Sequence, residues 1–287
     1  MELRTDLAVE ARESCGSSEG IESVEERHGD VTVSRITVLD ERGEKAIGKP
    51  RGSYVTVEVP PMTDRAFAVD ERYEAVSEEL ARLLPDKGLV LVVGLGNSSI
   101  TPDALGPRTA SQVLATRHIA DELRRTANFD ALRPAAVIAP GVLGQTGLEV
   151  VELLKSLCAS LKPAAVIAVD AMASRRLARL GCTVQISDAG ISPGAGVGND
   201  RPAIDRAALG IPVLSIGVPT VVEATTLAYD LGADSGEIEK TSPRGAGMIV
   251  TPREIDLLIS RASRLIALSV NHALHPTLDP VELLAAI

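Results

Sequence analysis

Two aspartates stand at the ends of two apolar segments, and they are the residues best suited to chemistry. Asp103 lies in LVLVVGLGNSSITPDALGP, and Asp170 lies in AAVIAVDAMASR. Continuous apolar runs of this kind predict buried strands, and a doubly wound sheet gathers its ligands at the carboxyl edge of such strands. If both strands are parallel neighbours, the two carboxylates converge.

Two carboxylates held close together cannot both ionise easily, so they share one proton. One then acts as a base toward water while the other donates to a carbonyl, which is how an aspartic dyad hydrolyses peptides. The same oxygens could instead hold a metal ion that activates water. A helix N-cap is the other interpretation of each residue, because aspartate is strongly preferred there. The repeated placement at the mouths of two strands favours the catalytic pair.

Glycine-rich loops surround the aspartate pair in the sequence. We expect Gly94, Gly96 and Asn97, together with Asp188 in the loop SDAGISPGAGVGN, to shape the cleft. The two glycines resemble half of a dinucleotide-binding fingerprint, but Ser99 replaces the third glycine and the acid expected further along is missing. The sequence therefore predicts no nucleotide cofactor, and we interpret the glycines as a tight turn after a strand.

Other nucleophiles and metal ligands are less well supported. No serine lies in a G-x-S-x-G motif, and Cys158 sits in an apolar helical segment, where a buried and inert thiol is expected. His272 and His275 could ligate a metal, but we interpret them as cations that complement the C-terminus of a helix. We therefore expect no cofactor, and a metal held by the aspartate pair is the alternative.

The composition excludes several classes of protein. The 287 residues are 45% hydrophobic and only 2% aromatic, with a net charge of -10. Such a chain can bury a large core, whereas an acidic surface with few aromatic rings argues against binding nucleic acid. No stretch approaches the ~18 apolar residues of a membrane span, and the N-terminus has no apolar signal core. Three separated cysteines form no disulfide framework, so we expect a cytoplasmic protein.

The order of the predicted elements indicates an α/β fold. Apolar strands are predicted at 89–93, 135–139, 164–169, 183–186 and 212–217, and helices at 70–84, 105–118, 148–161, 221–229 and 252–273. Apolar strands interleaved with helices imply a three-layer, mostly parallel sheet with helices on both faces. Alternating residues predict a small antiparallel β appendage at about 31–60, and 232–247 indicates a surface linker. Residues 1–30 carry nine acids against three arginines, which is typical of a solvated, loosely ordered segment.

Several blocks of the sequence resemble those of a known family. The blocks that carry the resemblance are RTDLAVEARE (4–13), AIGKPRGSYVTVE (46–58), VVGLGNSSITPDALGP (92–107), IAPGVLGQTGLE (138–149), IAVDAMASR (167–175), QISDAGISPGAGVGN (185–199), LGIPVLSIGVPTVVEA (209–224) and MIVTPREID (248–256). In this order, and over nearly the whole chain, they are similar to the germination protease family of spore-forming bacteria.

The resemblance implies an endopeptidase that degrades small acid-soluble spore proteins when the spore germinates, in the cytoplasm of the spore. It implies a core similar to that of hydrogenase-maturation endopeptidases. By resemblance, Asp103 and Asp170 occupy the positions of the family's essential aspartate pair. The hydrogenase-maturation relatives use a histidine with two acids for nickel, and this sequence has no histidine in a matching loop, which favours a metal-free pair.

Members of the family are made as inactive tetrameric zymogens that remove an N-terminal propeptide by self-cleavage. By resemblance the cut falls between Asp6 and Leu7, so 1–6 is the propeptide and 7–287 a single α/β peptidase domain. We accordingly expect a homotetramer that takes spore proteins as substrates and contacts neither nucleic acid nor membrane. A protein that grips spore proteins without cutting them is the alternative from another class, and the intact aspartate pair argues against it.

Overall fold

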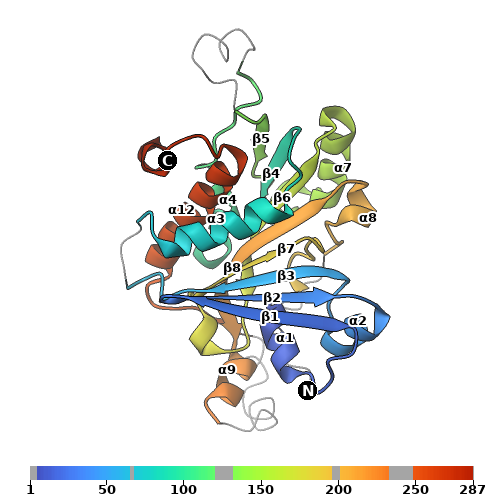
Figure 1. Cartoon of the computed structure of the whole chain (residues 1–287), viewed down its shortest axis with the longest axis vertical. Helices are drawn as coiled ribbons and strands as arrows, with labels where there is room; N and C mark the ends of the chain where they lie inside the picture. Colours follow the sequence, from blue (N-terminus) through green and yellow to red (C-terminus); the bar gives the residue numbers. More distant parts are fainter. Residues whose placement is uncertain (1–4, 65–67, 120–131, 196–200, 233–247, 287) are drawn as a thin grey trace.

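One large sheet organises the chain, with helices on both of its faces (Figure 1). The computed structural model describes residues 5–64, 68–119, 132–195, 201–232 and 248–286. Of residue 286 it describes the backbone only. The strands are β1 (Ile21–His28), β2 (Val31–Val38), β3 (Gly52–Glu58), β4 (Val90–Gly94), β5 (Ala135–Ile138), β6 (Ala165–Ala173), β7 (Thr183–Ser187), β8 (Val213–Glu223) and β9 (Ile249–Val250). The helices are α1 (Ala8–Ser14), α2 (Glu41–Ile47), α3 (Glu71–Leu83), α4 (Leu105–Ala110), α6 (Leu143–Thr146), α7 (Val150–Leu161), α8 (Arg206–Leu209), α9 (Ala224–Asp230), α12 (Ile255–Leu274) and α13 (Pro280–Ala286), with short 3₁₀ turns η1 (Thr101–Asp103) and η2 (Leu177–Arg179).

The sheet combines a parallel and an antiparallel part. Its strand order is β1-β2-β3-β7-β8-β6-β4-β5, and β9 pairs with β8. The neighbours β8, β6, β4 and β5 are parallel, whereas β7 runs antiparallel to both β3 and β8. The segment between β6 and β7 is too short for the crossover that a parallel return requires, so β7 reverses direction. The α/β fold class is confirmed, with an antiparallel part larger than the small appendage expected.

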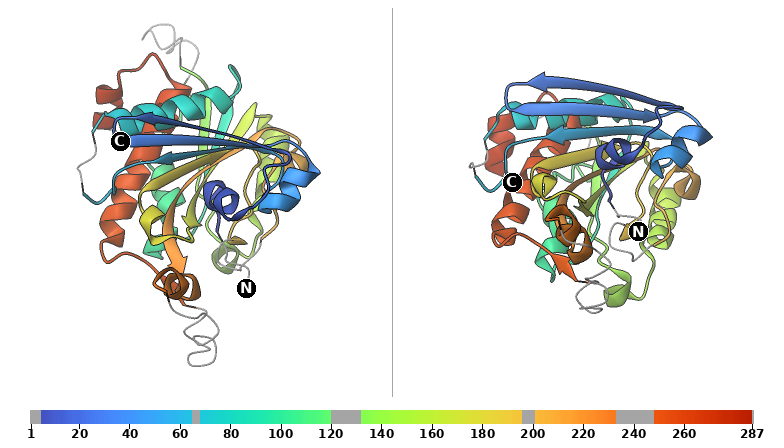
Figure 2. Two further views of the ribbon diagram at one scale, coloured as in Figure 1. Left: turned by 60° about the horizontal axis from the view of Figure 1, so that its bottom comes forward. Right: turned by 90° about the horizontal axis from the view of Figure 1, so that it is seen from below.

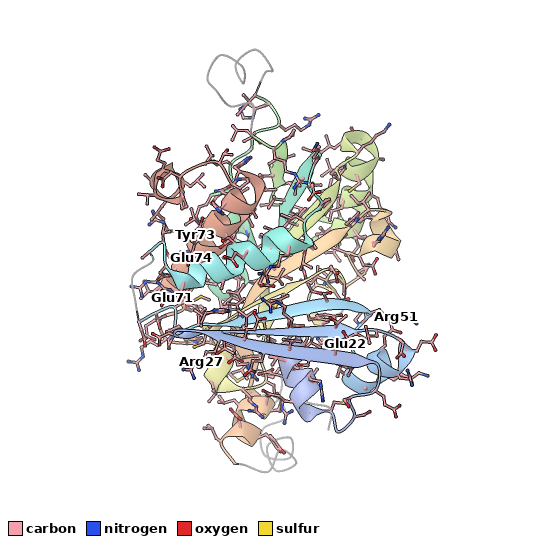
Figure 3. The ribbon with its side chains drawn as sticks, in the orientation of Figure 1. Glu22, Arg27, Arg51, Glu71, Tyr73 and Glu74 are labelled. Carbon is pink, nitrogen blue, oxygen red and sulfur yellow. The ribbon has the colours of Figure 1, made fainter. Side chains whose placement is uncertain are left out.

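The acidic N-terminal region is more ordered than expected. The prediction of a loosely ordered segment is wrong for the described residues after position 4, because α1 and β1 form there. Strand β1 pairs with β2 along its whole length and is exposed at all but its first residue. Figure 3 shows Glu22 and Arg27 on this outermost strand. Exposed charges suit an edge strand, because they discourage further strand pairing.

Several predicted boundaries shift in the structure. Strand β6 continues to Ala173, so Asp170 lies inside the strand rather than after it. Strand β8 continues to Glu223, so the helix expected from 221 begins only at Ala224. Helix α4 ends at Ala110, well before the expected end of that helix. The predicted linker lies outside the described residues apart from Gly232. In the described part of the chain, no helix is long and apolar enough to span a membrane.

The two faces of the sheet bury different clusters of side chains. One cluster lies under α3 and α12, a second lies under α7, and a third lies under α1 and α2. Figure 2 shows α12 and α7 on opposite sides of the strands. Along β6, Ile167 and Val169 belong to the first cluster, whereas Ala168 belongs to the second and Met172 to the third. Because side chains alternate along a strand, Asp170 faces the same side as Ala168 and Met172, between two apolar clusters.

Candidate active site

Asp170 lies in a row of paired residues that crosses three strands. It pairs with Gly217 of β8, which pairs in turn with Gln185 of β7. Residues in one row point to the same face, so the Asp170 and Gln185 side chains share the face that carries Met172. A Cβ atom on Gly217 would lie 2.3 Å from the carbonyl oxygen of Asp170 and 2.8 Å from Cε of Met172. A glycine is therefore needed between the two polar residues.

Asp103 is held in η1, just beyond the carboxyl end of β4. Its Oδ2 accepts a hydrogen bond from the backbone N–H of Asn97 at 2.8 Å, which closes the loop around the carboxylate. The hydroxyl of Thr220 donates to the carbonyl of Pro102 at 2.8 Å and ties the same turn to β8. Helix α4 begins after Ala104 without a side-chain cap, so the N-cap interpretation of Asp103 is wrong for this helix.

The glycines of the loop after β4 allow this close packing. A Cβ atom on Gly96 would lie 2.1 Å from the carbonyl oxygen and 3.0 Å from Oδ1 of Asp103, and the residue adopts a φ of +109°. On Gly94 it would lie 2.2 Å from the carbonyl oxygen of Gly106, at the start of α4. The Oδ1 of Asn97 accepts from Nε2 of Gln145 at 2.7 Å. These three predicted residues therefore build the loop that carries Asp103.

The charge of Asp103 influences the ionisation of Asp170. Asp170 is only 6% exposed, and its pKa is raised well above its usual value, first by burial and then by the charges of Asp103 and Asp6. The pKa of Asp103 is also raised by burial, against the opposing effect of the Asn97 N–H. Like charges that approach in a low-dielectric setting favour retention of a proton on one of them. The arrangement can thus supply an acid and a base at one place.

The N-terminal segment lies against the strand that carries Asp170. The backbone N–H of Asp6 donates to the carbonyl of Ala173 at 3.0 Å, and the N–H of Ala173 donates to Oδ2 of Asp6 at 2.8 Å. The carbonyl oxygen of Asp6 accepts from Nζ of Lys49 at 3.1 Å and from Nε2 of Gln185 at 2.9 Å. The peptide bond expected to be cut is therefore fixed beside the row that contains Asp170.

Lys49 and Gln185 did not emerge from the sequence as site residues, although both lie in the blocks that carry the family resemblance. In the strand TVQIS, a single glutamine stands between Val184 and Ile186, which both belong to the first apolar cluster. A buried polar residue on the opposite face of such a strand needs partners, and this signal could have indicated a role for Gln185.

Asp188 lies at the end of β7, where its side chain is exposed. Its Oδ1 accepts from the N–H of Ser53 at 2.6 Å, and its N–H donates to the carbonyl of Ser53 at 3.2 Å. These contacts fix the start of β3 against β7. They provide no hydrogen bond from Asp188 to either aspartate of the pair.

The two histidines near the end of α12 both have lowered pKa values. His275 is fully buried, and burial together with the nearby charge of Arg133 lowers its pKa to about 4. Burial also lowers the pKa of His272, whose ring meets the ring of Tyr73 edge to face at 5.6 Å. These lowered pKa values disfavour the charged forms and argue against the interpretation of these residues as charges complementing the helix. Among the described residues, no three His, Cys, Asp or Glu side chains are grouped so that they could hold a metal ion.

Comparison with known proteins assigns the chain to a family. The sequence profile of the germination proteases matches residues 2–232. The chain belongs to the germination protease family. It is 44% identical to a germination protease of Caldanaerobacter subterraneus subsp. tengcongensis, over 98% of this chain and 97% of that protein. The germination protease of Clostridium tetani is 39% identical, over 97% of this chain and 97% of that protein. The germination protease of Bacillus cereus (strain G9842) is 33% identical, over 96% of this chain and 95% of that protein.

This family member also overlaps with a solved structure, the NiFe hydrogenase maturation protease HycI from Thermococcus kodakarensis KOD1. The overlap has a TM-score of 0.38 and 18% identity, and covers 68% of this chain and 98% of that one. The family gives the chain an endopeptidase role in spore germination.

Proposed function

We propose that this family member is an endopeptidase that begins the degradation of small acid-soluble spore proteins during germination, with Asp103 and Asp170 activating water. The observation that carries the proposal is the raised pKa of Asp170, caused by burial and by the charge of Asp103. A carboxyl that keeps its proton beside one that ionises provides the acid and the base that peptide hydrolysis requires.

The two carboxylates take complementary parts in the proposed reaction. The more accessible Asp103 ionises first and accepts a proton from water, whose oxygen attacks the carbonyl carbon of the substrate. Asp170, which retains its proton, supplies it as the peptide bond breaks and the amine leaves. The loop of Gly96 and Asn97 supports this role by holding the Asp103 carboxylate in place.

The same pair is proposed to process the chain itself. In this proposal residues 1–6 are a propeptide, residues 7–287 are the mature peptidase domain, and the cut falls between Asp6 and Leu7. The contacts of Asp6 with Ala173 support it, because they hold the bond beside the strand of Asp170. We further propose that the zymogen is a homotetramer and that it acts inside the spore.

A degradation assay with a small acid-soluble spore protein tests this function. We expect the full chain, incubated until self-cleavage is complete, to cut the substrate into defined fragments. Asp103→Asn and Asp170→Asn should each reduce cleavage by at least the ~10²–10⁴-fold that one general acid or base contributes. The matched control is Asp86→Asn, which alters an exposed aspartate in the loop between α3 and β4 and should leave cleavage unchanged.

A strong chelator separates the aspartate pair from a metal-dependent reaction. The proposal expects equal cleavage with and without the chelator. Loss of cleavage on chelation, with recovery when a divalent metal is added back, would show that the reaction depends on a metal ion and would contradict the metal-free aspartate pair. Binding of the spore protein without any fragment from the wild-type chain would instead indicate a binding protein.

A further inference from the structure

The carbonyl group between Asp6 and Leu7 is gripped by two side chains from distant parts of the chain. Lys49 reaches it from the loop after α2, and Gln185 reaches it from β7. Their donor atoms lie 3.1 Å and 2.9 Å from the carbonyl oxygen. Enzymes that cleave acyl groups place donors at about 2.7–3.1 Å from the oxygen that becomes negative in the transition state.

The orientation of the Gln185 amide is fixed by a second contact. Its Oε1 accepts from the backbone N–H of Ala8 at 2.6 Å, so its Nε2 must face the Asp6 carbonyl. Gln185 is 4% exposed, and a buried amide that makes both contacts cannot turn easily. The row through Gly217 sets this amide on the same face of the sheet as Asp170.

Lys49 is fixed in a similar way. Its ammonium group donates to the carbonyl of Thr5 at 3.0 Å as well as to that of Asp6. Burial lowers the pKa of Lys49, although the charges of Asp6 and Glu10 oppose this effect. A poorly hydrated ammonium group interacts more strongly with a developing negative charge than one in bulk water does.

We propose that Lys49 and Gln185 form the oxyanion-stabilising site of the self-cleavage reaction. This inference rests on the proposed self-processing at Asp6. Water adds its oxygen to the Asp6 carbonyl carbon and gives a proton to the ionised carboxylate of the pair. The carbonyl oxygen becomes an oxyanion that Lys49 and Gln185 hold. The C–N bond then breaks, the carboxyl that kept its proton donates it to the nitrogen of Leu7, and a carboxylic acid at Asp6 and the free amine of Leu7 result.

Full-length variants test this role. Lys49→Met and Gln185→Met remove the donors and keep side chains of comparable length. Each should slow the appearance of a chain that begins at Leu7 by about 10²–10³-fold, the usual loss for one oxyanion donor. Lys49→Arg keeps donor groups and should restore part of the rate. Lys45→Met, at an exposed position in α2, is the matched control and should process like the wild type.

Hydrogen exchange at the amides of Asp6 and Ala173 distinguishes chemistry from docking. The proposal expects both amides to stay protected in Lys49→Met and Gln185→Met while cleavage is lost. Processing near the wild-type rate in both variants would overturn it. Loss of protection together with loss of cleavage would also overturn it, because the two residues would then only clamp the segment. A wild-type chain that never cuts after Asp6 would remove the self-processing proposal itself, which the wild-type control reveals separately.

Discussion

Asp6 and Ala173 are joined by two hydrogen bonds that run in opposite directions. The N–H of Asp6 donates to the carbonyl of Ala173, and the N–H of Ala173 donates to the Asp6 carboxylate. The pair attaches the N-terminal segment to β6, three residues beyond Asp170. The uncut chain thereby brings a negative charge close to the buried carboxyl group of Asp170, and that charge helps to raise the pKa of Asp170.

The first prediction concerns the charge of Asp6. Asp6→Asn keeps an oxygen that can accept from Ala173 and removes the negative charge. Ionisation of Asp170 then becomes easier, so its pKa falls. We expect the pH profile of self-cleavage to move toward lower pH in this variant. A pH profile that stays in place, or moves toward higher pH, would contradict the finding that the charge of Asp6 raises the pKa of Asp170.

The second prediction concerns stability and pH. The pKa of Asp170 is higher in the folded chain than its ordinary value, so the folded state binds the proton more tightly. The contribution of Asp170 to folding therefore improves as pH falls through the folded-state pKa toward the ordinary value, by about 1.4 kcal/mol for each unit of difference. At pH above the folded-state pKa, the buried charge destabilises the fold.

Asp170→Asn removes the buried charge and so isolates its effect on the free energy of unfolding. We expect its free energy of unfolding to exceed that of the wild type at about pH 8, with the difference shrinking toward about pH 5. Urea denaturation of both chains at the two pH values measures this difference, and Asp86→Asn controls for a general change of charge. If the free energy of unfolding of Asp170→Asn exceeded that of the wild type by more at low pH than at high pH, the result would contradict the raised pKa of Asp170.

The third prediction concerns the loop that carries Asp103. Gly96→Ala introduces a Cβ atom 2.1 Å from the carbonyl oxygen of Asp103, at a φ of +109°. Backbone strain of this kind costs about 1–3 kcal/mol, and relief requires Asp103 to move. We expect a lower unfolding midpoint together with slower cleavage. Gly144→Ala, at a position with open space around it, should change neither, and equal behaviour of the two variants would refute the requirement for glycine.

The fourth prediction concerns the helix that would begin the mature chain. Glu10 of α1 is 1% exposed and accepts from the backbone N–H groups of Arg175 and Arg176 at 2.7 Å and 2.9 Å. In Glu10→Gln one of these amides faces an NH₂ group, so we expect a loss of about 1–3 kcal/mol in the free energy of unfolding. Glu22→Gln, on the exposed strand β1, is the control. Equal stability of both variants would show that Glu10 does not anchor α1.

The central layout of the fold could be predicted from the sequence because it depends on local patterns. Continuous apolar runs marked β4, β5 and β6, and apolar residues at helical spacing marked α3, which ends near Leu84 as expected. Strand ends were harder to place, since Asp170 and the residues after it continue β6 only because β8 extends beside them. Such pairing between distant segments leaves no local signal.

The candidate site divides in the same way. Asp103 and Asp170 could be identified as candidates from their position after apolar runs. Lys49 and Gln185 lie 136 positions apart in the sequence. Only the fold brings both of them to the carbonyl oxygen of Asp6. The order of α1 in the acidic region 1–30 has no local signal for a related reason: the partners of Glu10 lie beyond β6, far along the chain.

Asp103 and Asp170 are proposed to cut the bond after Asp6 together. Measuring the N-terminal sequence and intact mass of the full chain during incubation over a range of pH tests this directly. We predict that the wild type converts to a chain beginning at Leu7, whereas Asp103→Asn and Asp170→Asn remain uncut and folded. Conversion of either folded variant at the wild-type rate, or a wild-type cut at another bond, would contradict the account.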